Sequence, residues 1–256
     1  MFARFALATA AVAAASAPVT MRYKIEQKIE SKVDLSEFGQ GEQVENQTLT
    51  WHVTISYTDS AGGRVVHAVL DSLRMEGGMI PVPQPSIDSA KGTTYHGFLD
   101  GEWRLKSLTS SKSTLLGSQF ENALRLLHPS IPRGAKAGAS WTDTLDTPTK
   151  NTQADLKARA VRTITMGGTE SFQGSQATRL DVAMVSSVSG TLETPGGQAQ
   201  MKGGGPGTAT YYITADGHFV GGNSSSKTDA LVTIATAPGP IPVKTTTTTT
   251  VSVIKP

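Results

Sequence analysis

Hydrophobic and polar residues alternate along most of this chain, a period that is typical of strands with one buried face. Segments 19–29, 49–57 and 64–75 show it most clearly, and a turn at 59–63 joins the last two. They predict an antiparallel meander. The third segment is apolar on both faces around 65–70, which predicts a central strand covered on both sides. Residues 31–45, with two glycines, are expected to form a loop.

The second half of the chain continues in the same pattern. Asp100-Gly101 and Asp216-Gly217 predict hairpin turns. Further strands are expected at 93–99, 102–108, 154–166, 177–192, 208–214, 218–221, 228–236 and 243–254, with another that carries Trp141. Segment 243–254 is rich in threonine and is expected at a sheet edge. Segment 77–91 is predicted to be irregular, and the glycine-rich segment 194–207 is predicted to be a mobile loop.

Only segment 113–128 has helical periodicity. Its apolar residues Leu116, Phe120, Leu124 and Leu127 fall on one face at 3.6 residues per turn. Glu121 precedes Arg125 by four positions, which predicts an ion pair along the helix. Serines at 110, 111 and 113 offer N-caps, and Pro129 ends the element. A helix this short must pack its apolar face against another element, here the sheet.

Together these elements predict a mainly β fold. We expect a single strongly curved antiparallel sheet, a half-barrel of about a dozen strands, with the amphipathic helix packed in its concave face. The apolar face of the helix has two interpretations. It fills a core, or it closes a cavity that holds an apolar ligand.

The N-terminus predicts export. Residues 1–15 combine a basic start with an alanine-rich apolar run, which is typical of a signal peptide, and an uncleaved anchor is the alternative. Residues 16–256 then form a single β-rich domain, located in the periplasm or cell envelope. The chain has no cysteine, which excludes disulfides and thiolate metal sites. With 23 basic and 21 acidic residues the net charge is +2, and no basic cluster indicates a nucleic-acid partner.

Motifs for catalysis and metal binding are absent from the sequence. No nucleophile elbow, zinc-protease helix or phosphate-binding loop occurs, so we expect neither an enzyme nor a cofactor. The five histidines are scattered singly, which predicts no metal site. Asp71 and His67 share one strand face, either as a general-base pair or as ordinary polar groups. Arg179 and Asp181 predict an exposed ion pair.

The candidate ligand-binding residues are large and apolar or aromatic. Such side chains either line a pocket or fill a core. They are Leu116, Phe120, Leu124 and Leu127 of the helix, with Trp51, Tyr57, Trp103 and Tyr211 of the strands.

The order of elements resembles the periplasmic lipoprotein-carrier half-barrels of the Lol type and the related mycobacterial lipid-binding lipoproteins. Segments 134–143, with Trp141 and Asp143, and 211–219 also resemble exported bacterial β-rich proteins of unknown function. The resemblance implies an apolar concave cavity closed by a helix, and no catalytic residues. The missing lipobox cysteine departs from the lipidated members.

Two functions follow as hypotheses. The first is an exported binding protein for a lipid or other apolar ligand held between the helix and the curved sheet. The alternative is a non-catalytic structural or accessory subunit that docks on a membrane-associated assembly, through an exposed apolar patch or an edge strand.

Overall fold

The computed structural model describes residues 17–78, 82–150, 154–194 and 197–254. The predicted signal peptide lies outside these residues and stays a prediction. The described residues form eleven strands, one fewer than the dozen or so expected. They are β1 (Val19–Leu35), β2 (Gly41–Ser60), β3 (Gly63–Gly77), β4 (Thr94–Asp100), β5 (Leu105–Ser110), β6 (Ser140–Lys150), β7 (Ala154–Phe172), β8 (Ser175–Thr194), β9 (Gly197–Ile213), β10 (Phe219–Ile234) and β11 (Ile241–Val253).

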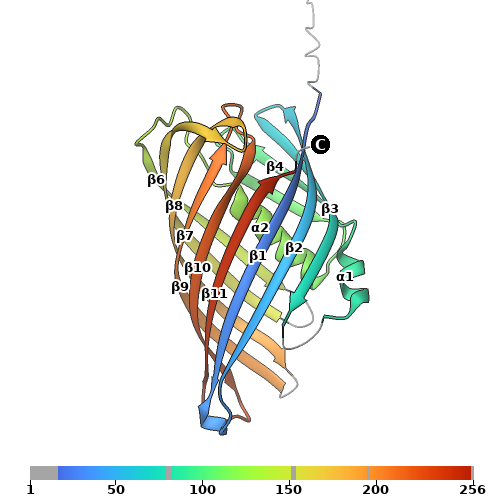
Figure 1. Cartoon of the computed structure of the whole chain (residues 1–256), viewed down its shortest axis with the longest axis vertical. Coiled ribbons are helices and arrows are strands. Elements are labelled where there is room, and N and C mark those ends of the chain that lie inside the picture. Colours follow the sequence, from blue (N-terminus) through green and yellow to red (C-terminus); the bar gives the residue numbers. More distant parts are fainter. Residues whose placement is uncertain (1–16, 79–81, 151–153, 195–196, 255–256) are drawn as a thin grey trace, which may run out of the picture.

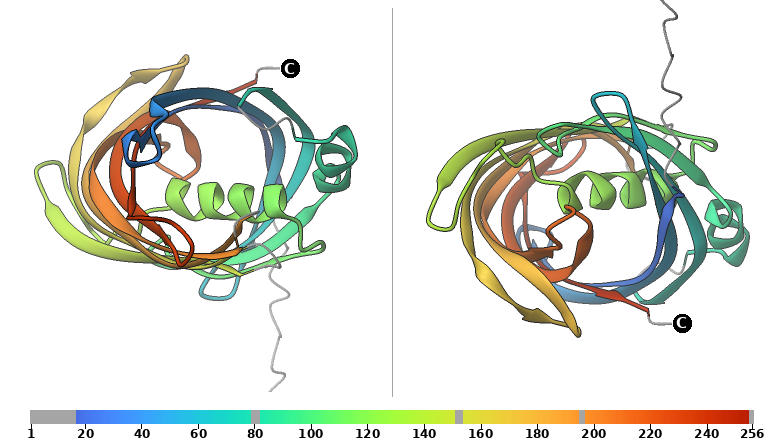
Figure 2. Two further views of the ribbon diagram at one scale, coloured as in Figure 1. Left: turned by 90° about the horizontal axis from the view of Figure 1, so that it is seen from below. Right: turned by 90° about the horizontal axis from the view of Figure 1, so that it is seen from above.

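All eleven strands belong to one antiparallel sheet, in the order β5-β4-β3-β2-β1-β11-β10-β9-β8-β7-β6. The first and last strands of the chain are therefore neighbours in the middle of the sheet, and β5 and β6 are its two edges. The sheet curls strongly, as Figures 1 and 2 show. The predicted mainly β fold with a single curled antiparallel half-barrel sheet is confirmed.

Helix α2 (Leu115–Leu127) joins the two edge strands, and Figure 2 shows it within the ring that the strands outline. The helix begins and ends close to the predicted positions. None of the expected serines is its N-cap. The N-cap is Thr114, whose Oγ1 accepts a hydrogen bond from the Gly117 amide at 3.0 Å. The predicted pair of Glu121 and Arg125 forms at 2.8 Å. Within the described part of the chain, no helix has the length and hydrophobicity needed to span a membrane.

The predicted loop at 31–45 is wrong. β1 continues to Leu35, a short 3-10 turn η1 (Ser36–Phe38) follows, and β2 begins at Gly41. Gly39 and Gly41 have φ angles of 72° and 70°, so two glycines are enough to reverse the chain here. Segment 77–91, predicted to be irregular, contains a short α-helix, α1 (Gln84–Ala90).

The predicted mobile loop at 194–207 is also wrong, since β9 begins at Gly197 and pairs with both β8 and β10. Its glycines allow close approach of neighbouring backbones. A Cβ at Gly204 would lie 2.2 Å from the Ser186 carbonyl oxygen, and one at Gly205 would lie 2.1 Å from that of Lys227. The glycine run that indicates flexibility in the sequence is therefore a requirement of strand packing.

Three smaller expectations also differ from the structure. β11 is not an edge strand, because it pairs with β1 on one side and β10 on the other. β10 is continuous where two strands were expected. The outer face of β3 is not covered, since Val65 on it is 40% exposed.

The strand assignment of residues 197–207 leads to a stability prediction. Gly204→Ala should lower the free energy of unfolding by about 1–3 kcal/mol, because the added methyl group overlaps the β8 backbone. Gly168→Ala is the matched control, since a Cβ there meets no atom within 4 Å. Urea denaturation measures both variants. Equal stability of the two would contradict the close packing of β9.

Candidate functional site

Seven of the eight predicted ligand residues are buried in one hydrophobic cluster. Phe120 of α2 is at its centre, with ring centroids 6.4 Å from Trp51 and 5.1 Å from Tyr95. The seven are Leu116, Phe120, Leu124, Leu127, Trp51, Tyr57 and Tyr211. The structure thus brings them together as tightly packed side chains. Tyr95, whose hydroxyl donates to the Gly117 carbonyl at 2.9 Å, belongs to the same cluster and was missed by the sequence analysis.

Trp103, the eighth residue, does not lie on a strand face as expected. It sits in the turn between β4 and β5 with a φ of 61°. The Arg64 guanidinium lies 4.6 Å from the centroid of its ring, and the ring packs against Gly217 in the turn between β9 and β10. Trp103 thereby joins the β4–β5 turn to the β9–β10 turn.

A cavity of about 230 Å³ lies between α2 and strands β1, β9, β10 and β11. Among the described residues, its lining combines apolar side chains with uncharged polar ones and contains no Lys, Arg, Asp or Glu. The lining residues are Ile25, Gln27, Ile29, Gln119, Asn122, Ala123, Leu126, Leu127, Tyr211, Ser224 and Thr249. Two of the predicted ligand residues, Leu127 and Tyr211, thus reach it.

The polar groups of this cavity can hydrogen-bond an uncharged ligand. The Gln27 amide donates to the Thr249 hydroxyl at the long distance of 3.5 Å, and the Asn122 amide donates to Thr149 at 3.4 Å. Such long bonds are weak, so both amides can exchange them for a ligand at little cost. Burial raises the pKa of Tyr211, so its phenol remains a neutral donor at neutral pH.

Beyond the cavity, the inner face of the sheet is only partly buried. Along β7, β8 and β9 outward-facing residues are mostly exposed and inward-facing ones mostly intermediate. Three further apolar side chains point inward there, because each is an even number of positions from a buried residue of its own strand. They are Leu156 with Arg162 on β7, Val188 with Val182 on β8, and Met201 with Tyr211 on β9. The interior on this side of α2 is therefore apolar and accessible to solvent.

A buried ion pair holds the C-terminal end of α2. Arg162 donates to the Asp143 carboxylate and, at 3.3 Å, to the Leu126 carbonyl, and both charged side chains are almost fully buried. A cation at a helix C-terminus is favourable because the free carbonyls there carry partial negative charge. Trp141 Nε1 donates to the Ser130 carbonyl at 2.8 Å. The Trp-x-Asp segment of the sequence thus fixes the chain just after α2.

His128, the C-cap of α2, is half-buried beside this pair. Its Nδ1 donates to the Leu124 carbonyl at 2.8 Å, which leaves Nε2 to accept from the Tyr57 hydroxyl at 3.2 Å. Burial lowers the pKa of His128 and raises that of Tyr57, so both groups are neutral at neutral pH. His218 packs edge-on against Tyr57 and contacts Arg64, and burial lowers its pKa too. These groups anchor the helix.

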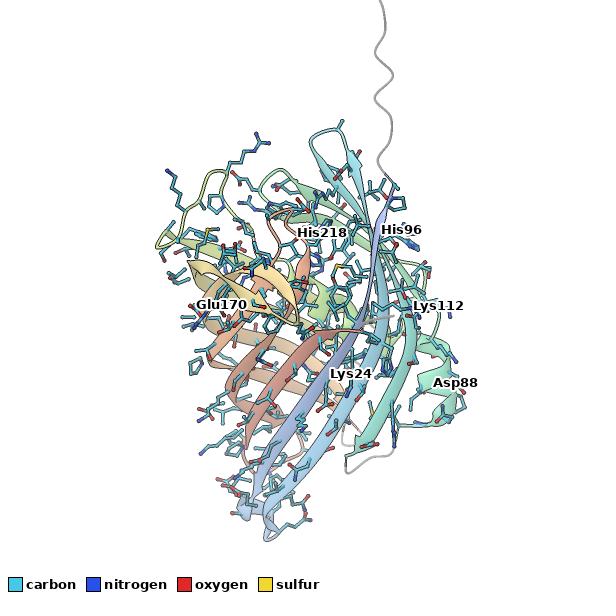
Figure 3. The ribbon with its side chains drawn as sticks, turned by 45° about the horizontal axis from the view of Figure 1, so that its top comes forward. Lys24, Asp88, His96, Lys112, Glu170 and His218 are labelled. Carbon is cyan, nitrogen blue, oxygen red and sulfur yellow. The ribbon has the colours of Figure 1, made fainter. Side chains whose placement is uncertain are left out.

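The remaining polar candidates lie on the outer face. Asp71 accepts from the Thr54 hydroxyl at 2.7 Å and does not form the general-base pair with His67, because a bulge in β3 falls at this position. Arg179 and Asp181 form the predicted exposed pair at 2.8 Å. Charged side chains such as Lys24 and Asp88 also point outward (Figure 3). Among the described residues, no three His, Cys, Asp or Glu side chains are grouped to hold a metal.

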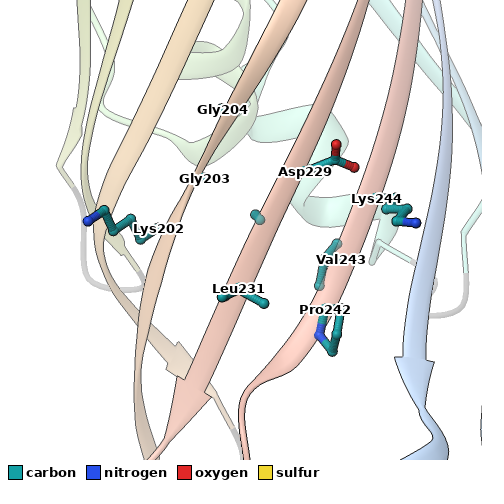
Figure 4. Close-up of a pocket in the computed structure, with 9 residues that line it drawn as sticks. Lys202, Gly203, Gly204, Asp229, Leu231, Pro242, Val243 and Lys244 are labelled. Atoms are coloured by element: carbon teal, nitrogen blue, oxygen red, sulfur yellow. The ribbon is translucent and has the colours of Figure 1, made fainter.

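A second depression of about 590 Å³ lies on strands β9, β10 and β11 (Figure 4). Most of its lining residues, including Lys202, Asp229 and Lys244, lie on the outer face of these strands. Gly204 contributes no side chain to it, and Leu231, which also lines it, is 50% exposed. The depression is a shallow apolar surface with charged margins.

Comparison with known proteins adds no relative. No family model, curated protein or solved structure matches this chain. The resemblance to Lol-type carriers therefore stays a prediction.

The buried ion pair leads to a second prediction. Asp143→Ala leaves the Arg162 charge buried without its partner, which should cost about 3–5 kcal/mol of unfolding free energy. Asp181→Ala removes the partner of an exposed pair and should cost about 0–1 kcal/mol. Chemical denaturation compares the two. Similar small losses would show that the Arg162 pair does not support α2.

The histidine anchor leads to a third, pH-dependent prediction. Because the folded-state pKa of His128 is below its ordinary value of 6.5, the unfolded chain takes up the proton more readily. This contribution to stability is complete above about pH 6.5 and is lost as the pH falls from there towards the folded-state pKa. His128→Gln should therefore lose less stability than the wild type between about pH 7 and about pH 5.

His52→Gln is the control for this measurement. His52 lies on the outer face of β2, with its Nδ1 2.9 Å from the Ser72 hydroxyl. The control variant should follow the pH dependence of the wild type. Parallel curves for the wild type and His128→Gln would contradict a lowered pKa of the imidazole at the end of α2.

Proposed function

We propose that this protein is a non-catalytic binding protein for an uncharged amphiphilic lipid or similar apolar molecule, held between α2 and the curled sheet. The observation that carries the proposal is the cavity under α2, which combines an apolar wall with uncharged hydrogen-bonding groups. The signal-peptide pattern of residues 1–15 supports a location in the periplasm or cell envelope. The proposal treats α2, packed in the concave face, as the wall that closes the site.

The lining of the cavity favours a neutral head group. A buried carboxylate or phosphate requires a cation or several strong donors to replace its hydration. In the part of the chain that the structure describes, no charged residue lines the cavity. The nearby Arg162 already donates to Asp143 and to the helix end. A hydroxyl, ester or amide head group matches the side chains of Gln27, Asn122 and Ser224 far better.

The size of the cavity favours a narrow ligand that extends beyond it. A volume of about 230 Å³ corresponds to roughly eight water molecules at about 30 Å³ each. Complete sites for drug-sized ligands are usually about 300–1,000 Å³. The cavity therefore accommodates the head group and the first part of a chain. The partly exposed inner face, with Leu156, Val188 and Met201, provides apolar surface for the remainder.

The anchoring of α2 supports its role as a fixed wall. Its N-terminal turn is capped by Thr114, and its C-terminal end is held by Arg162 and His128. Phe120 and Leu124, on its buried face, are at most 1% exposed. A ligand therefore enters along the open inner face of the sheet and leaves the helix in place.

Ligand binding can be tested by filling the cavity. Ala123 is a small lining residue on α2, so Ala123→Trp should block the site and weaken binding by about tenfold or more. The probe is the neutral fluorophore N-phenyl-1-naphthylamine, displaced by monolaurin and, separately, by laurate. Monolaurin should compete better than laurate, because the site offers no charged partner for a carboxylate.

Ala183→Trp is the matched control. Ala183 lies on the outward-facing side of β8 and is exposed, so this variant should bind as the wild type does. Failure of the folded wild type to bind the probe, or equal binding by both tryptophan variants, would refute a site under α2. A preference for laurate would refute the neutral head group.

The accessory-subunit function has support from one surface. The depression on β9, β10 and β11 has the half-exposed Leu231 at its margin, and Val185 on β8 is 66% exposed. Exposed apolar surface of this kind is typical of protein contacts. For that function Leu231→Glu would abolish association with native membranes, whereas Ala123→Trp would leave it unchanged.

A further inference from the structure

His67 and His96 lie side by side on the outer face of the sheet. They are directly opposite each other in the register of β3 and β4, and their ring centroids are 4.6 Å apart. The two positions are 29 residues apart in the chain, so no sequence spacing reveals the pair. Figure 3 labels His96, which is exposed on the outer face of β4, whereas its neighbour Tyr95 points inward and contacts α2. The pair is independent of the proposed ligand site.

The ring nitrogens of this pair are available to a ligand. Each of the other three histidines uses its ring in a polar contact: His52 with Ser72, His128 with Tyr57, and His218 with Arg64. Within the described part of the chain, the only interaction of His67 and His96 side chains is with each other's ring. His96 is exposed and His67 is half-buried, so solvent reaches both.

We propose that His67 and His96 form a two-histidine site for a divalent first-row transition-metal ion, with Cu²⁺ bound most tightly. Directly opposed residues on antiparallel strands have Cβ atoms about 4.5–5.5 Å apart, which lets two imidazoles bind one ion at about 2.0–2.1 Å. Imidazole suits copper, nickel and zinc, and affinity increases towards Cu²⁺ in this series. The rigid sheet holds both ligands in place before the ion arrives.

The surroundings of the pair are uncharged. In the registers of the sheet, Ser56 is opposite His67 on the other side of β3, and Thr109 is opposite His96 on β5. No carboxylate in this row competes for the imidazoles or adds a third ligand. Water completes the coordination of the ion, which makes the site open and exchangeable.

Copper titration of the full chain tests the site. One Cu²⁺ should bind per molecule, and electron paramagnetic resonance should show hyperfine coupling to two imidazole nitrogens. His67→Gln and His96→Gln should each weaken binding by about a hundredfold, because a chelating second ligand contributes about that much through its effective concentration. Zn²⁺ should bind at the same place and more weakly than Cu²⁺.

His52→Gln serves as the control, since it removes an outer-face histidine that has no histidine neighbour. It should retain wild-type affinity. Because His67 and His96 lie on the outer face, circular dichroism without metal should show all three variants folded. Unchanged affinity in both His67→Gln and His96→Gln, an equal loss in His52→Gln, or coupling to a single nitrogen would overturn the proposal.

Discussion

The pairing of β1 with β11 determines the arrangement of the rest of the molecule. It joins two meanders, β1 to β5 and β6 to β11, into one sheet whose two edges are consecutive in the chain. The connection between β5 and β6 must therefore pass from one edge of the sheet to the other. α2 makes this crossing, and because the sheet curls, the crossing passes through its interior (Figure 2). The position of the helix thus follows from strand order.

The crossing separates two kinds of interior. On the side of Trp51, Phe120 and Tyr95 the side chains form a closely packed core. On the other side the inner face keeps its alternating pattern but is only partly buried. The cavity lies at the boundary, where uncharged polar side chains meet the wall of α2. The ligand site that we propose at this boundary has one rigid side and one open side, which suits a ligand with a small head group and a flexible chain.

The sequence predicted what local patterning controls. Alternation identified most strands, and the apolar spacing in α2 identified the helix and the aromatic and leucine side chains that its packing brings together. The sequence did not predict which strands that are distant in the chain pair with each other. The threonine run of β11 resembles an exposed edge, although both of its neighbours hydrogen-bond to it. The glycines of β9 resemble a flexible loop, because their contacts with Ser186 and Lys227 involve residues distant in sequence. The cavity residues Gln27, Ser224 and Thr249 carried no local signal at all.

The most direct test of the central claim is the position of a bound ligand. Methyl-labelled protein with monolaurin should give intermolecular nuclear Overhauser effects from the lipid to Ala123, Leu126 and Ile29, which line the cavity under α2. The end of the lipid's acyl chain should give such effects to Val188 or Met201 on the inner face of the sheet. Contacts confined to Leu231, at the outer depression, would contradict the account.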